Sequence, residues 1–174
     1  REDDDEAFLS KFDDIIELFY QAAEEQVLEE KNIKFISEKH QAFYMEKMQN
    51  AKFKDVYHQA LYYCIGVNAD TRFHFENIFD EEIHCVRLEC LQEGWQTSGS
   101  LKVVRMAFNL FCNGTPTVNQ KKNAKEKLEE CSRYSVEELF ACEYAPFFWQ
   151  AIQLRYPEYA VYNNAHAELF GSED

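Results

Sequence analysis

Carboxylates are the side chains of this sequence best placed to do chemistry, and they gather at its beginning. Twelve of the 32 acidic residues lie within residues 1–30, where Arg1 and Lys11 are the only basic residues, so this block has a formal charge of −10. The rest of the chain supplies only −4 of the total −14. Such a block attracts cations and repels phosphate. A protein groove lined by Lys and Arg is therefore a better partner than nucleic acid itself.

These carboxylates are expected to follow one helix. Apolar residues recur every three or four positions over residues 4–30, which predicts an amphipathic helix about 40 Å long. Its nine net negative charges give about one charge per 4.5 Å, comparable with one phosphate per ~3.4 Å of a DNA strand. The helix could thus occupy a channel built for nucleic acid. The predicted partner-binding residues are Asp3, Asp4, Asp5, Asp13, Asp14, Glu17, Glu24 and Glu25. The alternative is a solvated face that keeps an aromatic-rich protein in solution.

Imidazole and thiolate groups offer a second kind of chemistry. Four residues are of types that bind zinc: His74, His84, Cys85 and Cys90. Their H-C-x4-C spacing matches no familiar zinc motif, and no second Cys-x-x-Cys pair follows. Buried thiols with ordinary histidines are the better interpretation. We expect no metal and no cofactor.

The sequence gives only weak signs of a phosphate-binding site or of catalysis. The run from Gly94 to Ser100 precedes Lys102 and Arg105, an arrangement that can hold a phosphate at a helix N-terminus. It lacks the ending of a P-loop, and an ordinary N-cap loop explains it better. No Ser/His/Asp or Cys/His signature is present. We therefore predict that the protein is not an enzyme and has no catalytic residue.

The elements that position these residues are predicted to be helical. The chain has 174 residues, 46% of them hydrophobic, and only five glycines and three prolines. A many-stranded fold needs many turns, and these few glycines and prolines supply too few turn residues for it. The prediction is an all-α, single compact domain of roughly six to eight helices with an aromatic-rich core. Its parts are an acidic N-terminal helix over 1–32 and a helical core over 33–174 packed with it as one domain.

Capping residues locate the helices of the core. Helices are expected over about 38–50 after Ser37, from Asp55 to Gly66, from Asp70 and Thr71 onward, and from Ser98 or Ser100 to Asn113. Residues 83–97 are less regular. Further helices are expected over 121–131, after the capping box at Ser135, from Ala145 until just before Pro157, and weakly over 158–170.

The sequence also bears on the protein's location. No stretch approaches the roughly 18 to 20 apolar residues that a membrane helix needs, and an acidic N-terminus is the opposite of a signal peptide. The six cysteines are interpreted as reduced thiols. These features favour a cytoplasmic protein without membrane contact.

Three sequence blocks resemble a known family: residues 55–72 (beginning DVYHQALYY), residues 93–109 (EGWQTSGSLKVVRMAFN), and residues 134–157 (YSVEELF, then YAPFFWQAIQLRYP). They are similar to small proteins of unassigned function encoded on bacterial mobile elements, which we associate with anti-CRISPR inhibitors of type II Cas9 nucleases. The resemblance covers about residues 33–160 and leaves the acidic helix largely outside. It implies Cas9, or its guide-RNA complex, as the partner, and no catalytic residue.

Three functions follow as hypotheses. The first is an anti-CRISPR-type inhibitor that binds Cas9 through its acidic surface, as a DNA mimic, and blocks nucleic-acid binding or cleavage. The second is a non-catalytic assembly protein, such as a homodimer, that works through its aromatic stripe. The third, ranked last, is a small-molecule or nucleotide enzyme with Trp95 to Ser100 and Arg105 lining the site.

Overall fold

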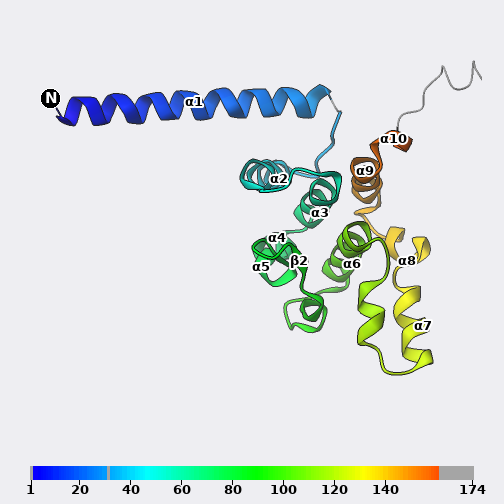
Figure 1. The fold of residues 1–174 in the computed structure, drawn as a ribbon. Coiled ribbons are helices and arrows are strands. Elements are labelled where there is room, and N and C mark those ends of the chain that lie inside the picture. Colours follow the sequence, from blue (N-terminus) through cyan, green and yellow to red (C-terminus); the bar gives the residue numbers. More distant parts are fainter. Residues whose placement is uncertain (1, 31, 161–174) are drawn as a thin grey trace, which may run out of the picture. The chain divides into compact units, whose positions relative to one another are not determined.

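A computed structural model describes residues 2–30 and 32–160, and within the first helix the side chains of residues 7 and 9–22 (Figure 1). The chain divides into two compact units, Arg1–Lys34 and Phe35–Asp174. Each is described by itself. The expectation that the acidic helix packs with the core as one domain stays a prediction.

The first unit contains one long helix. Helix α1 spans Glu2–Glu30, which confirms the helix predicted over 4–30. Acidic residues in its first turns suit the positive end of the helix dipole. No other described helix or strand belongs to this unit, so no second described element of the unit covers the apolar side of α1.

The second unit is mainly helical, which confirms the all-α prediction. Its longer helices are α2 (Glu38–Asn50), α3 (Val56–Gly66), α6 (Ser98–Cys112), α7 (Ala124–Ser132) and α9 (Ala145–Arg155). Its shorter ones are α4 (Ala69–Phe73), α5 (Phe75–Ile78), α8 (Val136–Phe140), α10 (Pro157–Ala160) and the 3-10 turns η1 (Leu88–Gln92) and η2 (Pro116–Gln120). Strands β1 (Phe79–Asp80) and β2 (Cys85–Val86) form one small antiparallel hairpin, in which Phe79 pairs with Val86.

Side-chain caps explain most helix starts. The Ser37 hydroxyl accepts a hydrogen bond from the His40 amide, and the Asp55 carboxylate accepts from the Tyr57 and His58 amides, as predicted. Helix α6 ends at Asn113, in the left-handed region with a φ of 56°, again as predicted. Asparagine tolerates this conformation better than most residues.

Two predicted boundaries were wrong. The fourth helix is capped by Asn68, whose side chain accepts from the Asp70 and Thr71 amides; Asp70 lies inside the helix. It stops at Phe73, whose side chain is 85% exposed. The helix predicted over 121–131 starts at Ala124, because η2 occupies Pro116–Gln120 and Asn123 is the cap.

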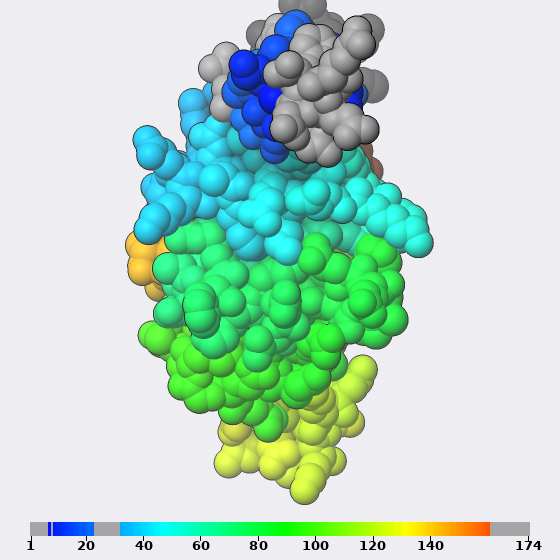
Figure 2. All heavy atoms as spheres, turned by 90° about the vertical axis from the view of Figure 1, so that its left-hand side faces the viewer, coloured from blue at the N-terminus to red at the C-terminus, as the bar shows by residue number. Residues whose placement is uncertain are grey.

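The core is built around α3, which packs against α2, α6 and α9 (Figure 1). Every residue from Ala60 to Gly66 is buried. Rings pack closely on this helix: the Tyr63 ring lies 4.6 Å from His40 and 5.6 Å from Phe35 between centroids. The aromatic-rich core is therefore confirmed. In the space-filling view α2 and the segment from α4 to η1 form one continuous face, and α7 lies at one end of this unit (Figure 2).

No helix in the described part of the chain is both long enough and apolar enough to span a bilayer.

Candidate functional site

The acidic surface of α1 is open to solvent where its side chains are described. Asp13, Asp14 and Glu17 are all exposed. No ion pair joins them to another described side chain of the first unit. Five further predicted residues fall within α1 (Glu2–Glu30), but their side chains lie outside the described residues: Asp3, Asp4, Asp5, Glu24 and Glu25.

The apolar side chains of α1 form a separate face, here called the apolar stripe: Leu9, Phe12, Ile15, Ile16 and Phe19. At about 100° per residue the stripe covers an arc of roughly 120°, and Asp13, Asp14 and Glu17 lie about 100° to 160° from its centre. The stripe residues are between 39% and 78% exposed. Helix α1 thus presents two faces of different chemistry.

The second unit contains a chain of hydrogen bonds through two imidazoles. The Asp55 carboxylate lies 2.9 Å from His58 Nδ1, and His58 Nε2 lies 3.1 Å from His84 Nδ1. His58 is buried, while Asp55 is largely exposed. Partial burial alone would raise the pKa of Asp55, but hydrogen bonds from His58 outweigh it and lower that pKa.

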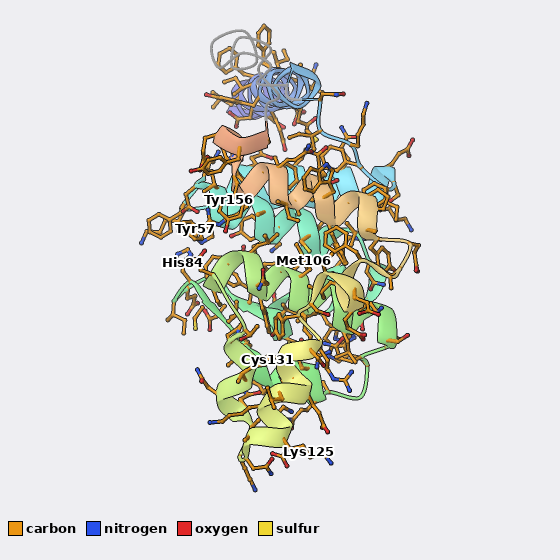
Figure 3. All side chains as sticks on the ribbon, turned by 90° about the vertical axis from the view of Figure 1, so that its right-hand side faces the viewer. Tyr57, His84, Met106, Lys125, Cys131 and Tyr156 are labelled. Atoms are coloured by element: carbon orange, nitrogen blue, oxygen red, sulfur yellow. The ribbon has the colours of Figure 1, made fainter. Side chains whose placement is uncertain are left out.

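An ionised carboxylate only accepts, so His58 Nδ1 carries the hydrogen of the first bond. The second bond joins His58 Nε2 and His84 Nδ1, and its direction follows the protonation of the two rings. His84 lies at the edge of the second unit (Figure 3) and lines a hollow with Lys47, Tyr62 and Glu81. Such a relay can transfer a proton and hold one tautomer.

Backbone geometry places His84 in this chain. The hairpin turn puts it in the left-handed region with a φ of 52°, a region in which His is enriched among non-glycine residues. Asp80 shapes the turn by accepting hydrogen bonds from the Glu82 and Ile83 amides. The sequence shows Asp55 and His58 three residues apart, a visible capping signal. Nothing in it places His84, 26 residues further on, against them.

The residues weighed for zinc do not come together. The His74 ring stacks on Trp95 at 4.3 Å, His84 pairs with His58, Cys85 is exposed and Cys90 is buried. Burial raises the pKa of the Cys90 thiol to about 12, which disfavours the thiolate that zinc requires. No group of three or more His, Cys, Asp or Glu side chains in the described ranges is arranged to hold a metal ion.

The loop before α6 forms an N-cap. Thr97 Oγ1 accepts from the Ser100 amide at 3.1 Å, and Ser100 Oγ accepts from the Thr97 amide at 2.7 Å, a reciprocal capping box. Lys102 donates instead to the backbone carbonyls of Glu138 and Ala141. Arg105 pairs with buried Glu130 at 3.1 Å. Both cations of the possible phosphate site are therefore engaged elsewhere.

Comparison with known proteins gives one finding. Residues 30–168 match the model of a family of unknown function, DUF6075. The match begins at the last residue of α1 and includes the second unit's helices. No curated protein and no solved structure matches the chain.

Proposed function

We propose that this chain, which belongs to the DUF6075 family of unknown function, is a non-catalytic binding protein whose acidic helix α1 enters a cationic groove of a nucleic-acid-binding protein. The groove of a Cas9-type nuclease is the specific partner proposed, with inhibition of nucleic-acid binding or cleavage as the outcome. This reading places the activity on α1, which lies almost entirely outside the family match.

The observation that carries the proposal is the exposure of Asp13, Asp14 and Glu17 without an ion pair to another described side chain of the first unit. Some basic side chains of the second unit have acidic partners of their own. Lys47 pairs with Glu81 at 3.0 Å and Arg87 with Asp80. Carboxylates without such partners remain available to Arg and Lys side chains of another protein, where they gain charge-assisted hydrogen bonds.

A Cas9 nuclease has the matching chemistry. It holds its guide–target duplex in a positively charged channel and reads its PAM with arginines. A row of carboxylates at nearly the spacing of phosphates can compete there, and the sequence resemblance described above supports the same target. A positively charged channel in another nucleic-acid-binding protein would meet the same electrostatic requirement.

The test measures binding to purified Cas9, with and without guide RNA, together with DNA binding by the loaded nuclease. The working variant replaces five carboxylates of α1: Asp13→Asn, Asp14→Asn, Glu17→Gln, Glu24→Gln and Glu25→Gln. The matched control makes the same charge change on exposed residues of the second unit: Glu76→Gln, Glu82→Gln, Glu137→Gln, Glu143→Gln and Glu158→Gln.

We expect the dissociation constant for the nuclease to rise roughly tenfold or more in the α1 variant and to change little in the control. Added salt should weaken the wild-type complex, because exposed charges are screened within about 10 Å at 0.1 M salt. Equal loss in both variants would mean that only net charge matters. An α1 variant that binds and inhibits like the wild type would reject the acidic face as the contact.

A further inference from the structure

We infer that the apolar stripe of α1 pairs with the same stripe of a second copy of the chain, so that the dimer turns two acidic faces outward. This inference deepens the proposed function, on which the role of those faces rests. The pairing itself can be tested without any nuclease.

The first observation is how much apolar surface the stripe exposes. Phe19 is 78% exposed, Leu9 60%, Ile15 57% and Phe12 54%. Scattered apolar residues on a surface are ordinary, but a contiguous row of large ones marks a contact surface. The first unit has no second described element that could cover it.

The second observation is the size of the surface. Aromatic side chains bury about 150 to 250 Å² each. With the lower part of that range for Leu and Ile, the exposed parts of the five stripe residues amount to roughly 500 Å² in each copy. Two copies would together bury about 1,000 Å² from the stripe alone, which reaches the size of a specific interface. Flanking residues of a 29-residue helix would add to this area.

The third observation is the separation of charge from the stripe. Asp13, Asp14 and Glu17 lie outside the apolar arc, so pairing through the stripe does not bring these carboxylates face to face. A two-fold contact uses the same patch on both copies and closes on itself. A second copy is therefore an occupant of matching length and chemistry.

The dimer would have a functional consequence. With the stripes packed together, the acidic faces of the two helices point away from each other on opposite sides of the pair. Each face keeps its own row of carboxylates and can meet a cationic surface separately. Pairing would also stabilise the helix that holds these rows, because most helical stability in proteins comes from packing of an amphipathic face.

The experiment is sedimentation velocity of the full chain from about 1 to 100 µM, a range that covers ordinary dimer affinities. The test variant is Phe12→Ser with Phe19→Ser, at the centre of the stripe. The matched control is Leu18→Ser, because Leu18 is 64% exposed on the same helix but lies outside the apolar arc. A conservative variant, Phe12→Leu with Phe19→Leu, keeps an apolar stripe. Circular dichroism records helix content in every sample.

We expect a dimer for the wild type, for Leu18→Ser and for the leucine pair. The serine pair should raise the dimer dissociation constant by roughly 100-fold or more, since central aromatic residues dominate interfaces. A wild type that stays monomeric at 100 µM would overturn the inference, and the stripe would then be covered within one chain. A serine pair that dimerises like the wild type would overturn it as well.

The two proposals fail in different ways. The five-carboxylate variant should dimerise normally and lose nuclease binding. The serine pair should lose dimerisation while its carboxylates remain to bind the nuclease. A wild type that dimerises but does not bind the nuclease therefore removes the proposed function alone, and a wild type that binds the nuclease as a monomer removes the pairing alone.

Discussion

His40 lies at the centre of the core with its ring fully buried. Its Nε2–H donates to the Tyr63 carbonyl at 2.7 Å, and its Nδ1 accepts from the Ile36 amide at 3.2 Å. Both ring nitrogens are satisfied only in the neutral form, because the protonated ring has no acceptor left. Burial lowers the pKa of His40 to about 4, opposed by the bond to Tyr63 and assisted by the charge of Arg72.

This pKa predicts a pH dependence of stability. The unfolded chain takes up a proton at His40 near pH 6.5, whereas the folded chain does so only near pH 4. The stabilisation is therefore complete above pH 6.5 and is lost as the pH falls from 6.5 to 4, by on the order of 3 kcal/mol. Urea unfolding of the wild type and of His40→Gln across this range measures it. Parallel curves for the two proteins would contradict the prediction.

Gly66 is needed because His40 packs directly against it. A Cβ atom there would lie 2.6 Å from His40 Cδ2 and 3.0 Å from Phe43 Cδ1. The His40 ring is held by two hydrogen bonds and cannot easily move. We expect Gly66→Ala to lower the free energy of unfolding by about 1 to 3 kcal/mol, despite the better helix propensity of alanine.

Chemical denaturation of Gly66→Ala tests this at neutral pH. The matched control is Gly94→Ala, because nothing lies within 4 Å of a Cβ at Gly94. The control should stay within about 0.5 kcal/mol of the wild type. Equal stability of Gly66→Ala and the wild type would contradict the prediction and show that the His40 ring moves aside to make room for the added Cβ.

At the scale of elements, α7 is anchored by a charged residue. Every other residue of Ala124–Ser132 is exposed, and Glu130 alone is buried. Its carboxylate accepts from Thr117 Oγ1 at 2.6 Å and from Arg105 Nε at 3.1 Å. Burial would raise the pKa of Glu130, but the hydrogen bonds from Thr117 and Arg105 lower it overall. This carboxylate joins α7 to α6 and η2.

Removing this anchor should cost far more than removing a surface pair. We expect Glu130→Ala to destabilise the protein by about 3 to 5 kcal/mol, because Arg105 would keep a largely buried, unpaired charge. The control is Glu129→Ala, which loses an exposed pair with Lys125 at 4.0 Å and should cost less than about 1 kcal/mol. Thermal unfolding compares them. Similar melting temperatures for the two variants would contradict a structural role for Glu130.

At the scale of the whole molecule, folding of the second unit should not require the first unit. Among the described side chains, every buried apolar residue belongs to Phe35–Asp174, so this unit has a core of its own. We expect a fragment of residues 35–174 to unfold cooperatively, with a melting temperature within a few degrees of the full chain. It should neither bind the nuclease nor dimerise. Calorimetry and sedimentation test this, and a fragment that fails to fold would assign α1 a role in the core.

Several features follow from the sequence by itself. The long amphipathic helix, the caps at Ser37 and Asp55 and the end of α6 at Asn113 are local, because each depends on side chains within a few residues of the backbone that they order. The concentration of acid on one helix is likewise visible in the chain. The proposed binding surface could therefore be predicted as a set of residues.

Only the tertiary structure decided which side chains meet. The sequence contains His58 and His84, or Glu130 and Arg105, without any sign that they touch. These contacts join residues more than twenty positions apart, through a hairpin and a docked helix whose geometry depends on the packed core. From the sequence alone, Lys102 and Arg105 could likewise form an anion site. In the packed structure each of them has a partner inside the fold. Local chemistry determines elements, whereas burial determines which charges remain available to another molecule.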